Sequence, residues 1–112
     1  MWELFNGGKT RGQRGSENGT IVLDEEIPNT ARITLERGAT TAPFAITCGI
    51  YYRLVHTCFL GDESKALAQY ESMKSDLAAV LEMMPEAADP DYGAKRERAD
   101  EAVARFVSQY PP

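Results

Sequence analysis

The stretch FAITCGIYYRLVHTCFL, residues 44–60, decides the fold. Its first eight residues alternate Phe, Ile, Cys and Ile with small or polar residues and Tyr, the period of a half-buried strand. Residues 54–60 are almost continuously apolar or β-favouring, which is typical of a central strand or of one covered on both faces. The connection near Tyr51, Tyr52 and Arg53 has no Gly, Asn or Asp at its tip, so one long bent strand also fits the pattern.

Two further strands precede this stretch. Residues 20–27 place Ile21, Leu23 and Ile27 on one face and acids on the other, except that Glu25 falls on the apolar face. Pro28 then interrupts the run, and residues 31–36 alternate apolar and polar side chains again. Residues 20–60 therefore predict an antiparallel meander of four strands.

The first nineteen residues give weaker signals. Residues 6–19 contain five of the nine glycines and no apolar residue, which predicts a flexible glycine-rich loop that adds nothing to a core. Before this loop, Trp2, Leu4 and Phe5 form a short apolar patch. The patch is compatible with a fifth strand at the edge of the sheet or with a terminal anchor onto the core.

The second half of the chain has the period of helices. Residues 62–84 place their apolar side chains on an arc of roughly 140°, with Asp62 as an N-cap and Pro85 as the stop. Residues 90–110 form a second such arc, introduced by Asp89 before Pro90. Strands grouped first and helices afterwards predict an α+β domain spanning residues 1–112, in which both amphipathic helices pack on one face of the sheet.

Composition limits the partners. The net charge of −5 argues against nucleic acid, because the average field of the chain repels phosphates. The sequence has no run of about 18 apolar residues that could cross a membrane, and its start lacks the pattern of a secretory signal. We therefore expect a cytoplasmic protein, whose two cysteines are reduced thiols and which needs no cofactor.

Cys48, His56 and Cys58 are the first candidate site. His56 and Cys58 are two residues apart on one strand and so share a face, and all three converge if Cys48 lies opposite Cys58. Thiolates and imidazole are zinc ligands, and a Cys/His pair can also act as a nucleophile. Ordinary packing is the favoured interpretation, because cysteine is often buried and no CxxC or HExxH spacing is present.

Two further candidates lie elsewhere in the predicted sheet. Tyr51, Tyr52 and Arg53 collect the side chains that are enriched at binding hot spots, although ordinary aromatic packing at a sheet edge is the favoured interpretation. Glu25 is an acid in phase with apolar neighbours, which indicates either an irregular strand or a functional group.

These signals favour a non-catalytic protein-interaction or regulatory module over an enzyme. We expect a homodimer, because a sheet covered on one face leaves another face and its edges to pair with a second copy. One alternative is a small-molecule-binding domain or minor enzyme with a pocket between sheet and helices, using His56, Tyr51 or Glu25. The other is a metal or thiol site at Cys48, His56 and Cys58.

Overall fold

The computed structural model describes all residues from Met1 to Pro112. The chain forms two compact units, Met1–Tyr70 together with Pro112, and Glu71–Pro111. The boundary between them falls inside helix α1 (Glu63–Glu82). The expected single domain over residues 1–112 stays a prediction.

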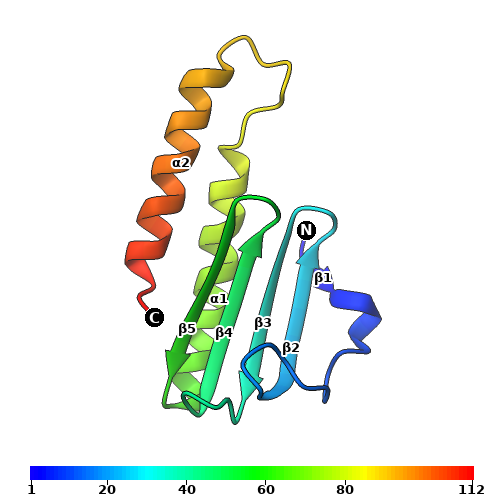
Figure 1. The fold of residues 1–112 in the computed structure, drawn as a ribbon. Helices are drawn as coiled ribbons and strands as arrows, with labels where there is room; N and C mark the ends of the chain where they lie inside the picture. The colour runs from blue at the N-terminus through cyan, green and yellow to red at the C-terminus, as the bar shows by residue number, and fades with distance from the viewer. The chain divides into compact units, whose positions relative to one another are not determined.

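The first unit is built on a five-stranded antiparallel meander, in which each strand pairs with the next one along the chain (Figure 1). Within the short patch before the glycine-rich segment, only Glu3 and Leu4 form a strand, in which they pair with Glu26 and Glu25. The α+β class and the antiparallel sheet predicted from the sequence are confirmed. The strands are β1 (Glu3–Leu4), β2 (Thr20–Ile27), β3 (Ala31–Arg37), β4 (Phe44–Ile50) and β5 (Leu54–Leu60).

The register divides the sheet into two faces. On the face that we call the inner face, Ile33 and Leu35 of β3 lie opposite Cys48 and Ile46 of β4, and all four are buried. The first turns of α1 contact this face, since the Tyr70 hydroxyl lies 3.4 Å from the carbonyl oxygen of Ile33. The outer face carries the alternate residues, among them the row that joins Thr34, Thr47 and Thr57.

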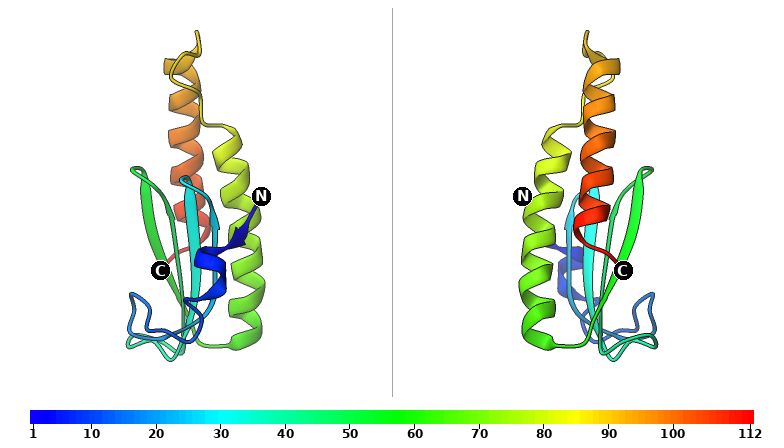
Figure 2. Two further views of the ribbon diagram at one scale, coloured as in Figure 1. Left: turned by 90° about the vertical axis from the view of Figure 1, so that its right-hand side faces the viewer. Right: turned by 90° about the vertical axis from the view of Figure 1, so that its left-hand side faces the viewer.

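The prediction that residues 6–19 add nothing to a core is wrong, because this segment contributes to the buried part of the first unit. The Glu36 side chain on β3 is fully buried, and its carboxylate accepts hydrogen bonds from the amides of Gly19 at 3.0 Å and Glu17 at 3.1 Å. A side chain at Gly15 would place Cβ 2.2 Å from Cδ of Glu36, so only glycine fits there. Figure 2 shows the segment, in blue, lying against the sheet. Backbone donors to a buried acid replace the missing apolar side chains.

Strand β2 also departs from the predicted alternation. Ile21 pairs with Glu36, whereas Leu23 pairs with Leu35, so two steps along β2 match one step along β3. This is a β-bulge, which breaks the period of two and moves Ile21 out of the row pattern that Leu23 and Ile27 follow. The predicted apolar face of residues 20–27 is therefore wrong at Ile21.

The second unit consists of α1 from Glu71 onward and helix α2 (Tyr92–Gln109), which run antiparallel to each other (Figure 1). The Tyr110 hydroxyl bonds Ser72 at 2.6 Å and also donates to Asp76, which ties the end of α2 to α1. Both helices are shorter than the predicted ranges 62–84 and 90–110, since α1 ends at Glu82 and α2 begins only at Tyr92. None of the helices combines the length and apolarity needed to cross a bilayer.

The predicted helix caps have different outcomes. Asp62 does cap α1, because its Oδ1 accepts the Lys65 amide at 3.0 Å, and this bond lowers the pKa of the Asp62 carboxyl. Asp89 does not cap α2, where Asp91 occupies the cap position. Asp89 instead accepts a hydrogen bond from Lys95 at 2.6 Å, the main cause of its lowered pKa.

Candidate functional site

The turn between β4 and β5 has an unusual backbone. The Arg53 amide donates to the carbonyl oxygen of Ile50 at 2.9 Å, and Tyr52 has a φ of +67°. A positive φ at the second central residue is the pattern of a type II turn, where glycine or asparagine normally stands. Residues 44–60 therefore form a hairpin and not one long bent strand, and the turn holds Tyr52 in the left-handed region.

No burial of the Tyr52 side chain offsets the free-energy cost of this conformation. Its exposed fraction is 106%, so its side chain contacts little of the rest of the chain. The left-handed region costs an L-residue with a bulky side chain about 1–2 kcal/mol. Folding of the single chain would be better served by asparagine or glycine at this position, and local strain of this kind is common at functional sites.

A hollow of about 480 Å³ lies beside the turn. Its floor is on the outer face, where Gly49 stands between Arg32 of β3 and Val55 of β5 in the register. Because glycine has no side chain, it leaves space in this row, and the neighbouring Val55 is 82% exposed. The hollow is mainly apolar and is lined by Arg32 and by the continuous run of residues 47–55.

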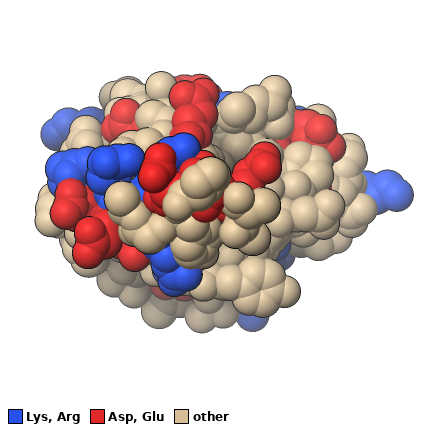
Figure 3. All heavy atoms as spheres, turned by 90° about the horizontal axis from the view of Figure 1, so that it is seen from above, with Lys and Arg blue, Asp and Glu red and all other residues tan.

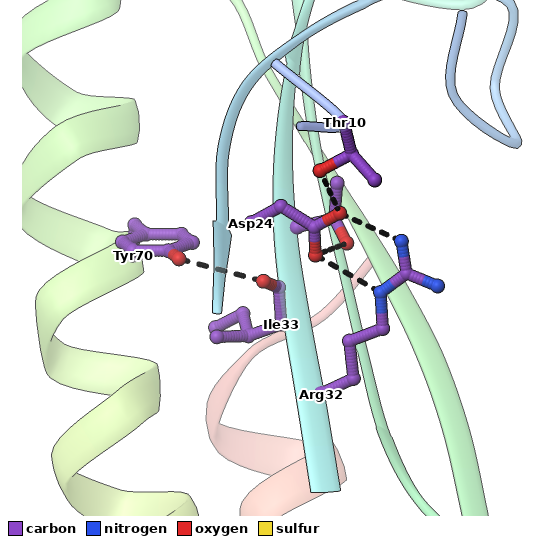
Figure 4. A network of polar contacts seen from close by, with 6 residues as sticks. Thr10, Asp24, Arg32, Ile33 and Tyr70 are labelled. Atoms are coloured by element: carbon purple, nitrogen blue, oxygen red, sulfur yellow. Dashed lines mark hydrogen bonds and ion pairs between the residues drawn. The ribbon is translucent and has the colours of Figure 1, made fainter. Parts of the chain in front are cut away.

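Arg32 is the fixed wall of this hollow. Its Nε and Nη2 donate to the two carboxylate oxygens of Asp24 at 2.9 and 2.6 Å, and its guanidinium stacks 3.6 Å from the centre of the Phe5 ring. The hydrogen bond to Asp24 is the main cause that raises the pKa of Arg32. Thr10 also donates to Asp24, at 2.8 Å (Figure 4), and Thr34 donates to the same carboxylate at 3.1 Å. The buried acid is thus fully satisfied, and Arg32 has one defined position.

The structure separates the residues that the sequence singled out. Tyr51, Tyr52 and Arg53 lie together at the turn and line the hollow. His56 and Glu25 lie elsewhere, in one row across the inner face and separated by Ile33 and Cys48. Glu25 accepts a hydrogen bond from the Tyr70 hydroxyl at 2.9 Å, which explains an acid in phase with apolar neighbours.

The two cysteines are buried thiols. Cys48 lies opposite His56, and Cys58 lies opposite Ile46, so the pairing of Cys48 with Cys58 does not form. Burial raises the pKa of the Cys48 thiol to about 12, and the nearby Cys58 adds to the rise. Burial also raises the pKa of Cys58, against a hydrogen bond from Gln69. No three His, Cys, Asp or Glu side chains in residues 1–112 are grouped so that they could hold a metal ion.

Charged side chains do not define a second site. A hollow of about 450 Å³ in the second unit is lined by residues of both signs, including Glu82, Lys95 and Arg98. Figure 3 likewise shows acidic and basic side chains interspersed on one face of the molecule. The hollow at the β4–β5 turn differs, because two arginines and no acid line it.

Sequence reasoning missed Arg32 and Gly49 as parts of this site. The sequence predicts Arg32 as a solvated side chain of an alternating strand. Gly49 did carry a signal, because an isolated glycine inside a strand often marks a close approach or missing side-chain volume. No protein-family model, curated protein or solved structure matches the chain. The functional proposal therefore depends on the geometry of the β4–β5 hairpin.

Proposed function

We propose that this chain is a non-catalytic protein-interaction module that binds another polypeptide through its β4–β5 hairpin. The observation that carries the proposal is Tyr52, a fully exposed aromatic side chain held at a φ of +67° beside an apolar hollow. The strained backbone of such a residue destabilises the single chain, and its aromatic ring becomes buried only when a second molecule covers it.

The chemistry around Tyr52 fits a polypeptide partner. Tyrosine and arginine are the residues that most often dominate protein interfaces, and both Tyr51 and Arg53 flank Tyr52. Val55 adds an exposed aliphatic surface at the side of the hollow. Arg32 is held rigidly by Asp24, so the hollow is already formed before a partner arrives.

Photo-crosslinking from the turn tests the proposal. A benzoyl-phenylalanine in place of Tyr52 is expected to form a covalent adduct with a polypeptide, either in the purified protein or in an extract of the source cells. The matched control carries the same amino acid in place of Leu67, an exposed apolar residue on α1. Absence of any position-52 adduct above the level seen at position 67 would refute the proposal.

The volume of the hollow supports a second candidate, a small-molecule-binding function. About 480 Å³ lies within the range of roughly 300–1,000 Å³ that ligand pockets occupy. A compound that binds there is expected to raise the melting temperature of the wild type. It should have no effect on a Gly49→Ala variant, whose added Cβ enters the floor 3.0 Å from the carbonyl oxygen of Leu54. A screen without any such compound would remove this candidate.

A further inference from the structure

We infer that the polypeptide bound by the hairpin is a second copy of this chain, which pairs antiparallel along the outer edge of β5 about a twofold axis at Thr57. The inference rests on the proposed function, because it uses the same hairpin. It adds the identity of the partner and the register of the pairing.

The two edges of the sheet are built differently. At one edge β1 has only two residues, one of them the charged Glu3, and short charged edge strands resist pairing with other chains. At the other edge β5 has seven residues and pairs only with β4 in the sheet. Residues 54–60 contain no Lys, Arg, Asp, Glu, Pro or Gly, so β5 lacks the charged and proline residues that often protect an edge strand.

The sequence of β5 is chemically symmetric about Thr57. In an antiparallel pair centred there, each residue faces the one equally far from Thr57 on the second copy. Leu54 then faces the partner's Leu60, Val55 faces the partner's Phe59, and His56 faces the partner's Cys58. Apolar residues therefore meet apolar residues at both ends of the strand, and Val55, which is 82% exposed in the single chain, gains a cross-strand neighbour.

Charges beyond the strand ends are complementary in the same register. Arg53, one residue before β5, lies at the end of the pair where the partner's chain leaves its own β5 and continues to Asp62 and Glu63. The twofold axis repeats this contact at the other end of the pair. No like charges face each other within residues 54–60, which matters for a chain with a net charge of −5.

The same geometry limits the assembly to two chains. Each copy offers one long, unprotected edge, and the twofold pairing uses both of them. The β1 edge that remains at each end of the joined sheet is short and carries Glu3. The pair is therefore closed and does not grow into a fibre.

Sedimentation equilibrium of the purified chain tests the inference. The wild type is expected to have twice the single-chain mass of 12.4 kDa. Val55→Lys and Thr57→Lys each place a lysine on the pairing edge and are expected to raise the dissociation constant of the dimer about tenfold or more. The matched control Leu67→Lys adds the same charge on α1 and should leave the dimer unchanged. Circular dichroism checks that all variants keep the fold.

A charge exchange tests the register itself. Arg53→Glu or Glu63→Arg alone should weaken the dimer, and the two changes together should restore it. A wild type that sediments as one chain would overturn the inference, as would a dimer that both lysine variants leave intact or an exchange that fails to restore the dimer.

The crosslinker at position 52 separates this inference from the proposed function. In the purified dimer, the turn that carries Tyr52 lies beside the end of the partner's β5, so photolysis is expected to yield an adduct of two chains. Adducts with a different polypeptide only, together with a single-chain wild type, would overturn the dimer and support the proposed function. No adduct in either setting would overturn both.

Discussion

Replacing Tyr52 by asparagine is expected to stabilise the folded chain, even though it removes an aromatic side chain. Tyr52 has a φ of +67°, where an ordinary L-residue loses about 1–2 kcal/mol and asparagine is several-fold enriched. Its exposed fraction of 106% means that little packing is lost on substitution. A net gain of about 0.5–1 kcal/mol in the free energy of unfolding follows, because asparagine relieves part of the strain.

Thermal and urea denaturation measure this gain. For a chain of this size, 1 kcal/mol corresponds to a shift of roughly 4 °C, so we expect the melting temperature to rise by about 2–4 °C. Asparagine is a better probe than glycine, because glycine also stabilises the unfolded chain by about 0.4–1 kcal/mol. Both proteins are compared at a concentration well below the dissociation constant of the proposed dimer, so that a loss of pairing does not mask the effect.

Tyr51→Asn is the matched control, since Tyr51 is the neighbouring tyrosine and its φ is not positive. This variant should be neutral or less stable than the wild type. The interpretation of strain at the turn is refuted if Tyr52→Asn lowers the melting temperature, or raises it no more than Tyr51→Asn does. The proposed function adds that Tyr52→Asn binds its partner more weakly while it folds more stably.

Three further outcomes follow from the described contacts. Gly15→Ala should destabilise the chain by about 1–3 kcal/mol in urea denaturation, because its Cβ would lie 2.2 Å from Cδ of Glu36, whereas Gly61→Ala, which has open space, should be nearly neutral. Arg32→Met should cost about 1–3 kcal/mol, because it removes two hydrogen bonds from the buried Asp24 carboxylate, and the exposed Arg37→Met serves as its control. Iodoacetamide at pH 8 should not label Cys48 in the native protein, because a thiol with a pKa of about 12 is ionised in roughly one molecule in ten thousand at that pH. Rapid native labelling of Cys48 would contradict its burial.

The sheet could be predicted because its strands follow a local rule. Alternation of apolar and polar residues located three of the four longer strands, and the nearly continuous apolar run of residues 54–60 located the fourth. The bulge near Ile21 was not predictable, because one inserted residue hides inside an otherwise regular pattern. Glu25 was flagged but not explained, since the hydroxyl that it accepts from belongs to Tyr70, 45 residues later.

The buried acids show a second limit of the pattern. Asp24 and Glu36 fall on the polar side of their strands, which predicts solvated side chains, yet both are buried. Residues 6–19 donate hydrogen bonds to both acids, through backbone amides and the Thr10 hydroxyl. The composition of this segment does not indicate that it packs against the sheet. Burial of this kind depends on contacts distant in sequence and requires the three-dimensional structure.

The candidate site was predictable only in part. Tyr51, Tyr52 and Arg53 could be selected by residue type, since hot-spot residues are recognisable in a sequence. The left-handed backbone of Tyr52 and the hollow above Gly49 could not, because both depend on which turn and register the hairpin adopts.

Hydrogen exchange at the amides of β5 tests the interaction surface most directly. An edge strand that pairs with a partner should be protected along residues 54–60, and Val55→Lys should lose part of this protection while the amides of β3 exchange at unchanged rates. Equal exchange rates for β5 in the wild type and in Val55→Lys, at every protein concentration, would contradict pairing along this edge.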